Sequence, residues 1–451
     1  MGYIYGLAVV LAIFEGIMIQ CEGRPRRMQE LPLLPDDVIE LIFSKTDFKT
    51  LHGALRSYIV PANNIVMSKI LQDYIIVMNQ VLLDNITERI LIGESFLIFG
   101  NYPRLELFFE RFGDRVKKIQ IELDEDSDIH SEKVIQNIFK KYAKHFEELR
   151  ILTENDEGFW REILDGENVI TFPEVKRLEI RGESSRNELK LNLIFPKLEY
   201  FTLIGNVADI NLLENVKTLK ELTLDTDSIR YDKLENIFKN NKNMTKIYLS
   251  EPDRAETMHS IAKYLTKLET LQIAYPHEDF VLRTNNNTVP KLSSVTNFDI
   301  LFNEMNEVFG SGDLSFDMPN LKKLTLRGDL LDDRIIIFIQ HFEKLEIVEF
   351  FVEEYNGVNC IEELKHIKEI TTYFHENRLD SLKNMFENFD KESELQTVKF
   401  LDFDGTTFEK YEKDMVEFNI KLRISLKPTW TLSQAEHIET YQKYLIFRRD
   451  P

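Results

Sequence analysis

Cysteine is almost absent from this chain of 451 residues, which contains only Cys21 and Cys360. Two cysteines cannot form the framework of disulfides that stabilises small secreted domains. Their scarcity favours a reducing compartment, either the cytoplasm or the nucleus. Three acceptor sequences for N-glycosylation, which begin at Asn85, Asn243 and Asn286, favour secretion instead.

Positive charge is also in short supply. The chain has 56 lysines and arginines against 77 aspartates and glutamates, so its formal net charge at pH 7 is -21. Binding to nucleic acid needs an excess of basic side chains on one face, because each contact neutralises a phosphate. We therefore expect no nucleic-acid partner.

Signatures of metal and cofactor sites are missing as well. The nine histidines show no paired metal-ligand spacing with cysteine or carboxylate. The string "GSGDLS" from Gly310 has two glycines but not the third glycine of a nucleotide-binding loop. The sequence therefore predicts no metal, no cofactor and no catalytic residue.

Long apolar runs are missing apart from "YIYGLAVVLAIFEGIMI" (Tyr3 to Ile19). This run is short and is interrupted by Glu15, so we expect no stable membrane span. Small residues at Cys21 and Gly23 give it the layout of a secretory signal, although no basic residue precedes it. Residues 1–23 are interpreted either as a cleaved signal or as an upstream stretch from a misplaced start.

What the chain does contain is a phrase, apolar-x-x-apolar-x-apolar, that recurs roughly every two dozen residues. The clearest copies start at Val116, Val175, Leu198, Leu219, Met244, Leu268, Val295, Leu321, Leu345 and Leu395, and weaker ones start at Leu149 and Ile367. Intervening segments such as Tyr231–Asn243 and Arg334–Lys344 carry apolar residues at helical spacing. Each unit is therefore predicted to be a strand followed by a helix.

Stacked units of this kind would bury the first, fourth and sixth residues of each phrase in one continuous core. The residues between them would point outward onto a concave sheet face. From these outward positions we select a candidate surface for binding a protein: Arg177, Tyr200, Glu221, Lys246, Tyr248, Gln272 and Lys323. The other outward residues are Glu179, Thr202, Thr223, Thr270, Thr325, Ile347 and Glu349.

The phrase and its spacing resemble those of leucine-rich repeat proteins of the irregular type. The resemblance covers residues 86–426 and implies an α/β solenoid with parallel strands on the concave face and helices on the convex face. "RILIGESF" from Arg89 is expected to form its first strand and "LRISL" from Leu422 its last. Residues 427–451 are predicted to form a capping helix that covers the end of the core.

A second motif precedes the repeats, in residues 31–74. Leu34-Pro35 is followed by two aspartates and then by apolar residues at helical spacing, which indicates the start of a helix. The order of these residues resembles the F-box, a small all-α module that docks onto the Skp adaptor of cullin-based ubiquitin ligases. The resemblance implies that the docking residues are Leu34, Pro35, Val38, Ile39, Ile42, Phe43 and Leu51.

Two functions follow from these expectations. In the first, the chain is the substrate-recognition subunit of an SCF-type ubiquitin ligase, with the Skp-type adaptor, the cullin scaffold and a protein substrate as partners. In the second, it is a secreted leucine-rich repeat module that binds a protein without any role in a ligase. Neither function makes the chain an enzyme.

One string resembles an enzyme motif. "VKFLDFDGTTFEK" (Val398 to Lys410) is similar to the first motif of haloacid-dehalogenase-type phosphatases, which would make Asp402 the nucleophile and Asp404 the general acid and base. That motif opens a Rossmann-like domain, and only 41 residues follow Lys410. We therefore interpret the string as the last repeat strand, with Leu395, Val398 and Phe400 pointing inward.

Overall fold

The structure is a computed structural model of the whole chain. It describes residues 75–79, 96–99, 102–123, 129–153, 170–182, 191–205, 213–226, 231–252, 256–276, 289–302, 316–331, 338–355, 366–374, 394–402, 430–436 and 443–449. The possible signal in residues 1–23, the predicted helical module in residues 31–74 and the strand predicted from Leu422 lie outside the described residues.

A single sheet of 16 strands organises the described residues, in the spatial order β15-β16-β14-β13-β12-β11-β10-β9-β8-β7-β6-β5-β4-β3-β1-β2. The strands are β1 (Ile75–Asn79), β2 (Phe96–Phe99), β3 (Lys118–Leu123), β4 (Glu148–Thr153), β5 (Arg177–Gly182), β6 (Tyr200–Ile204), β7 (Glu221–Asp225), β8 (Lys246–Ser250), β9 (Thr270–Ala274), β10 (Asn297–Phe302), β11 (Lys323–Leu331), β12 (Ile347–Tyr355), β13 (Glu369–Phe374), β14 (Thr397–Asp402), β15 (Trp430–Glu436) and β16 (Lys443–Arg449). From β3 to β14, strands that are neighbours in the sheet are also consecutive in the sequence.

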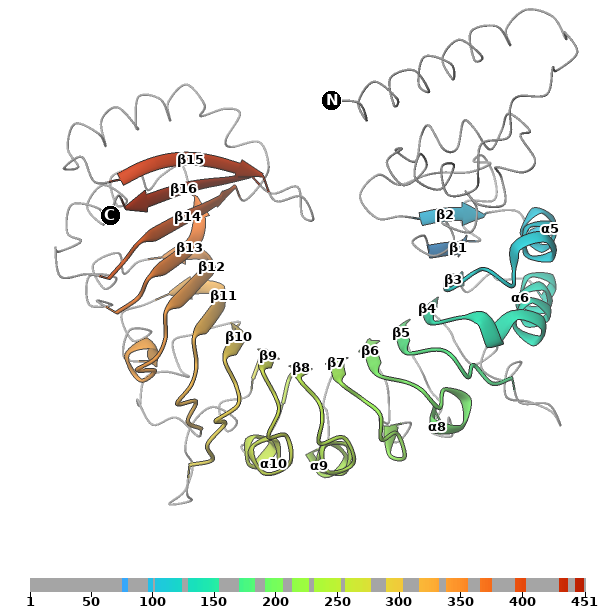
Figure 1. Ribbon diagram of the computed structural model, residues 1–451, viewed down its shortest axis with the longest axis horizontal. Coiled ribbons are helices and arrows are strands. Elements are labelled where there is room, and N and C mark those ends of the chain that lie inside the picture. Colours follow the sequence, from blue (N-terminus) through green and yellow to red (C-terminus); the bar gives the residue numbers. More distant parts are fainter. Residues whose placement is uncertain are drawn as a thin grey trace, which may run out of the picture.

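The strands from β1 to β14 pair with one another in parallel. They form an arc whose inner side is the sheet and whose outer side carries the helices (Figure 1). The helices are α5 (Tyr102–Phe112), α6 (Ile129–Tyr142), α8 (Leu191–Ile194), α9 (Tyr231–Asn240) and α10 (Glu256–Tyr264), with a 3₁₀ turn, η1 (Ala143–His145). The arrangement is a solenoid-like α/β fold with few helices. None of the helices among the described residues has the length and apolar character needed to cross a membrane.

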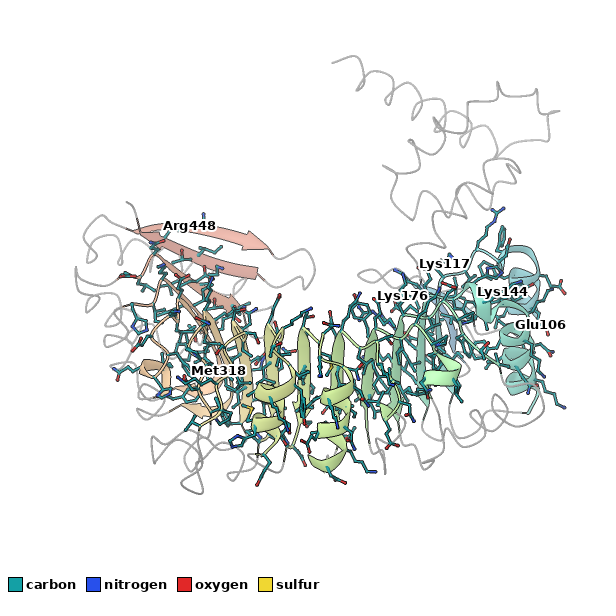
Figure 2. The ribbon with its side chains drawn as sticks, turned by 60° about the horizontal axis from the view of Figure 1, so that its bottom comes forward. Glu106, Lys117, Lys144, Lys176, Met318 and Arg448 are labelled. Carbon is teal, nitrogen blue, oxygen red and sulfur yellow. The ribbon has the colours of Figure 1, made fainter. Side chains whose placement is uncertain are left out.

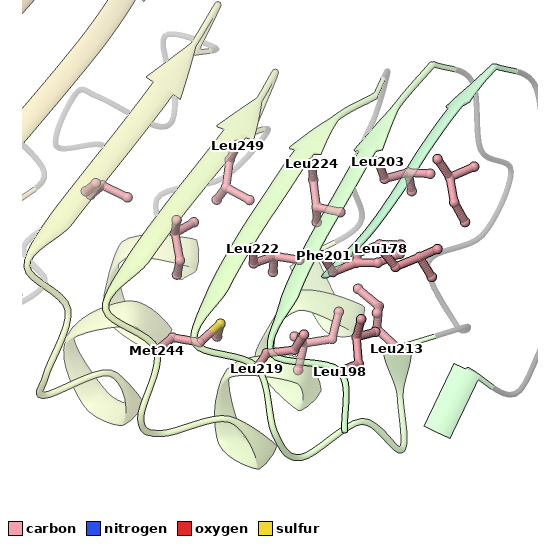
Figure 3. Close-up of a cluster of buried hydrophobic side chains, with 14 of the residues drawn as sticks. Leu178, Leu198, Phe201, Leu203, Leu213, Leu219, Leu222, Leu224, Met244 and Leu249 are labelled. Carbon is pink, nitrogen blue, oxygen red and sulfur yellow. The ribbon is translucent and has the colours of Figure 1, made fainter. Parts of the chain in front are cut away.

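The core lies between the sheet and the outer layer, and the recurring phrase fills it as predicted. In the copy that starts at Leu219, the side chains of Leu219, Leu222 and Leu224 are at most 1% exposed. Figure 3 shows these side chains stacked against those of the neighbouring copies, including Phe201 and Met244. Alternate residues of each strand point to opposite faces, so the side chains between them lie on the inner face of the arc.

In five repeat units the eighth residue, counted from the start of the phrase, has a positive φ angle. These residues are Gly182, Gly205, Glu251, Tyr275 and Gly328. Gly205 leaves no room for a side chain, because a Cβ atom there would lie 2.3 Å from the carbonyl oxygen of Gly182. Glycine adopts this conformation without steric cost, whereas Glu251 and Tyr275 adopt it as non-glycine residues with φ angles of 47° and 49°.

Three predictions about the repeat units have different outcomes. The helix predicted at Tyr231–Asn243 is confirmed as α9, although it ends at Asn240. The helix predicted at Arg334–Lys344 is seen at residues 338–340, and residues 334–337 lie outside the described residues. That a helix follows every strand stays a prediction, because the connections before β7 and β11 lie partly outside the described residues; their described parts, residues 214–220 and 316–322, consist of turns and chain without regular structure.

The predicted capping helix at residues 427–451 is wrong. Residues Trp430–Glu436 and Lys443–Arg449 form β15 and β16, which pair with each other in antiparallel fashion, and β16 pairs in the same way with β14. Aromatic and β-branched residues in "KYLIFRR" favour a strand, and pairing with β14 satisfies backbone groups that a helix would leave open at the sheet edge.

The predicted boundaries of the solenoid, residues 86–426, are also too narrow. β1 lies before residue 86, and β15 and β16 lie after residue 426, yet all three belong to the sheet. The expected first strand, "RILIGESF" from Arg89, overlaps β2 only at Phe96, and residues 89–95 lie outside the described residues. In addition, β1 lies between β2 and β3, so the strands at this end do not follow chain order.

Candidate functional site

The inner face of the arc carries three rows of side chains that run across the strands. We call them the first, second and third rows. They contain the third, fifth and seventh residues, counted from the first residue of each phrase, so the third row lies one residue beyond the phrase itself. In β7, for example, the rows contain Glu221, Thr223 and Asp225. Steps of about 4.8 Å between strands make the rows roughly 34 Å long from β5 to β12, which matches an extended segment of about ten residues.

All seven candidate surface residues lie on this face. Arg177, Tyr200, Glu221, Lys246 and Lys323 belong to the first row, and Tyr248 and Gln272 belong to the second row. Each of them is exposed or half-buried. Their predicted outward direction is therefore confirmed, and their role in binding stays a prediction.

A network of charges covers one side of the face, on β4 and β5. The Arg150 Nε atom lies 2.9 Å from a Glu148 carboxylate oxygen and 3.6 Å from a Glu179 oxygen. Arg181, in the third row, also pairs with Glu179. Because Glu179 is shared by two arginines, its charge is already compensated within the molecule.

Stacking of arginine on an aromatic ring occurs beside this network. The guanidinium carbon of Arg177 lies 4.4 Å from the centre of the Tyr200 ring on the next strand. Such a contact is favourable because the face of an aromatic ring carries negative potential. It also holds two of the candidate residues in fixed positions relative to each other.

A second network covers the other side of the face, on β9 to β12. Asp299 accepts hydrogen bonds from Gln272, at 3.1 Å, and from Arg327, at 3.0 Å. The Arg327 guanidinium also lies over the Phe351 ring, 5.1 Å from its centre. Asp299, Arg327 and Phe351 thus form a carboxylate–arginine–ring triad that runs across three adjacent strands.

The same part of the face contains a further ion pair. The Nζ atom of Lys323 lies 2.8 Å from one Glu349 oxygen, and the Thr325 hydroxyl donates a hydrogen bond of 2.9 Å to the other. Thr325 itself is only 4% exposed, so it serves mainly to position Glu349. These contacts leave little of the Glu349 charge available to a ligand.

The centre of the face differs, because β7 carries two carboxylates outside these networks. Among the described residues, Glu221 and Asp225 make no ion pair and accept no side-chain hydrogen bond. Tyr248 on the next strand is half-buried, and Tyr275 at the end of β9 is 38% exposed. Burial first, and then the negative charge of Asp225, raises the pKa of Tyr248 to about 12.

The charges of the face balance, although the chain as a whole is strongly acidic. On β5 to β12 the three rows contain five basic residues (Arg177, Arg181, Lys246, Lys323 and Arg327) and five acidic ones (Glu179, Glu221, Asp225, Asp299 and Glu349). Both signs therefore stand close together beside tyrosine, threonine and phenylalanine side chains. This mixture is typical of surfaces that recognise proteins.

The six-residue phrase does not predict the whole site. The third row lies beyond this phrase, so the phrase does not point to Arg181, Asp225, Arg327 and Phe351. Extending the alternation by one more outward residue would have found them. Tyr275 gave no signal, because its exposure depends on the positive φ angle at the end of β9.

The remaining sites of interest are only partly within the described residues. The predicted adaptor-binding residues, from Leu34 to Leu51, lie outside them. Asp402 is the last residue of β14; Val398 in this strand and Leu395 just before it are buried as predicted, whereas Asp404 and the side chain of Phe400 are not described. The part of the chain that is described contains no group of three or more histidine, cysteine or acidic side chains that could hold a metal ion.

Basic side chains lie near both ends of the arc (Figure 2). Lys117 and Lys176 lie towards one end and Arg448 towards the other (Figure 2).

Comparison with known protein families finds no family that matches this sequence, and no curated protein matches it.

Proposed function

We propose that this chain is a protein-binding repeat protein that acts as the substrate-recognition subunit of an SCF-type ubiquitin ligase. The observation that carries the binding part is the inner face of β5 to β12, which presents both compensated ion pairs and aromatic rings. Specific protein interfaces combine such rings with a small number of polar anchors. The ligase part rests on the resemblance of Leu34 to Phe43 to the F-box.

The mechanism is tethering. The helix predicted around Ile42 would bury its apolar side chains against a Skp-type adaptor, while the inner face of the arc holds the substrate. Both proteins would then be held on one chain, which raises the local concentration of the substrate beside the ubiquitin-charged enzyme. On this proposal, no residue of the chain carries out chemistry.

A test of the adaptor is capture of the full chain from cells, followed by mass spectrometry of its partners and of its mature N-terminus. The Ile42→Lys variant should lose the adaptor and the cullin, because a buried aliphatic anchor would be replaced by a charge. Leu193→Lys is the matched control, since Leu193 lies on α8 and is already 61% exposed. Equal recovery of the adaptor with Ile42→Lys and with the wild type would contradict the proposal.

A secreted binding module is the second candidate, supported by the apolar residues 3–19 and the three glycosylation sequences. The same experiment separates the two functions. A chain that begins near Arg24, carries glycans at Asn243 and brings down no adaptor would establish secretion. The proposed binding face would be the same in both cases.

A further inference from the structure

We propose that Asp225, Tyr248 and Tyr275 form the place on the inner face that takes a basic side chain, preferentially arginine, from the protein partner. This inference rests on the proposed function, because it assumes that the face binds a protein segment. It goes further by naming the chemistry that the segment must contain.

The first step is that Asp225, a carboxylate of the third row, does not take part in the internal charge networks. Glu179 is shared by Arg150 and Arg181, Asp299 is paired with Arg327, and Glu349 is paired with Lys323. Asp225 has no such partner among the described residues and is half-buried. A carboxylate that is partly removed from water gains most from a cation supplied by a ligand.

The second step is a comparison of the two halves of the face. In the triad of Asp299, Arg327 and Phe351, an arginine lies between a carboxylate and an aromatic ring. Tyr248 interacts electrostatically with both Asp225 and Tyr275, but no arginine among the described residues pairs with Asp225. The third-row residues of the next two strands are Ser250 and Ala274, which have the smallest side chains in that row between β5 and β12.

The third step concerns the rings. The exposed ring of Tyr275 follows directly after Ala274, where its backbone N–H donates a hydrogen bond of 2.7 Å to the carbonyl oxygen of Leu301. A guanidinium group can stack on a tyrosine face and donate two hydrogen bonds to a carboxylate, as its planar shape allows. Lysine can form the ion pair but not the paired hydrogen bonds, so arginine is preferred.

The field around the site favours the same ligand. Burial is the largest cause of the raised pKa of Tyr248, and the negative charges of Asp225 and Asp299 raise this pKa further. The opposing group is Arg327, which is already paired with Asp299. A net charge of -21 on the chain also attracts basic partners before contact.

The test is selection of random peptides of about 12 residues, displayed on phage, against the immobilised full chain at physiological ionic strength. Asp225→Asn is the test variant. Glu269→Gln, at an exposed position just before β9, removes the same amount of charge and is the matched control. Both variants should keep the thermal stability of the wild type, because neither side chain has a partner among the described residues.

We expect the wild type and Glu269→Gln to enrich peptides with arginine at one fixed position, and Asp225→Asn to lose this preference. For a single enriched peptide, Asp225→Asn should weaken binding roughly tenfold, the value of a charge-assisted hydrogen bond. Replacing the peptide arginine by glutamine should have the same effect on the wild type and little effect on Asp225→Asn.

Two outcomes would overturn the inference, and they differ in what they say about the proposed function. Enriched peptides without a basic residue, or with one that Asp225→Asn still selects, would reject the arginine site. If their binding is nevertheless lost with Tyr200→Ala, the inner face remains the binding surface. Failure to enrich any peptide on this face would count against both.

Discussion

The side-chain amide of Asn241 donates a hydrogen bond of 2.8 Å to the carbonyl oxygen of Val216, and its oxygen accepts one of 2.9 Å from the N–H of Leu219. Asn241 follows α9, whereas Val216 and Leu219 belong to the turn before β7. The amide also donates to the carbonyl oxygen of Ile237 within α9. Asn241 is only 2% exposed, so one buried side chain ties two successive repeat units together.

Replacing Asn241 by alanine should lower the free energy of unfolding by about 2–4 kcal/mol, because the backbone groups of Val216 and Leu219 would stay buried without partners. Urea denaturation followed by circular dichroism measures this change. Asn240→Ala is the matched control, since the amide of Asn240 makes one exposed hydrogen bond, to the carbonyl oxygen of Glu214. An equal loss of unfolding free energy in both variants would show that the buried hydrogen bonds of Asn241 add no more stability than the exposed one of Asn240.

The two kinds of residue at the eighth phrase position should respond in opposite ways to substitution. Gly205→Ala should destabilise the protein by roughly 2–4 kcal/mol, because alanine is strained at this positive φ angle and its Cβ would clash with the carbonyl oxygen of Gly182. Glu251→Gly should instead stabilise it by up to about 1 kcal/mol, since glycine adopts the positive φ angle freely. Thermal denaturation of both variants checks the signs, and a loss of stability with Glu251→Gly would contradict this explanation.

Tyr248 should make the protein sensitive to alkali. Its folded-state pKa is about 12, above the ordinary value of 10.0, so the folded state holds the phenol proton more tightly than the unfolded state does. The resulting stability is complete below pH 10 and is lost as the pH rises through 12. Tyr248→Phe should therefore lose less stability than the wild type over this range. Absorbance of ionised tyrosine near pH 11 should be the same in both proteins if Tyr248 titrates late, and a greater absorbance in the wild type would contradict the shift.

The ion pair between Glu346 and Lys368, which precede β12 and β13, makes the stability depend on pH in a second way. A hydrogen bond from Lys368 lowers the pKa of Glu346 below 4.5, and the same bond raises the pKa of Lys368 above 10.5. The contribution of Glu346 is present above pH 4.5 and disappears as the pH falls through its lowered pKa, whereas that of Lys368 is present below pH 10.5 and disappears as the pH rises through its raised pKa.

Glu346→Gln should therefore differ from the wild type in urea midpoint between pH 4.5 and 10.5, and the difference should shrink outside that window. Both side chains are exposed to solvent, so molar salt should remove most of the difference. A difference that is independent of pH and salt would mean that Glu346 acts through packing instead of charge.

The sequence predicts the repeated middle of this fold well, because the information there is local. In the copies that start at Leu219 and Leu345, the three inward residues are all at most 3% exposed, as their period requires. The same period predicts that Tyr200 and Tyr248 point away from the core, and both lie on the inner face of the arc. The resemblance to the leucine-rich repeat and to the F-box remains a prediction.

The ends of the sheet could not be predicted in the same way. The pairing of β16 with β14 joins residues that are far apart in the sequence, and no local pattern near Trp430 specifies it. Tyr275 and Asn241 depend on one backbone angle and on a turn in the preceding unit. Such features arise from contacts between units, and a single phrase does not contain them.

The most direct test of the central claim is capture from cells with two full-length variants, one for each proposed surface. Tyr200→Ala combined with Tyr248→Ala should lose the captured substrate proteins and keep the adaptor and the cullin. Ile42→Lys should lose the adaptor and the cullin and keep the substrates. If the tyrosine variant instead retains every protein captured by the wild type, the inner face of the arc is not the surface that selects the substrate.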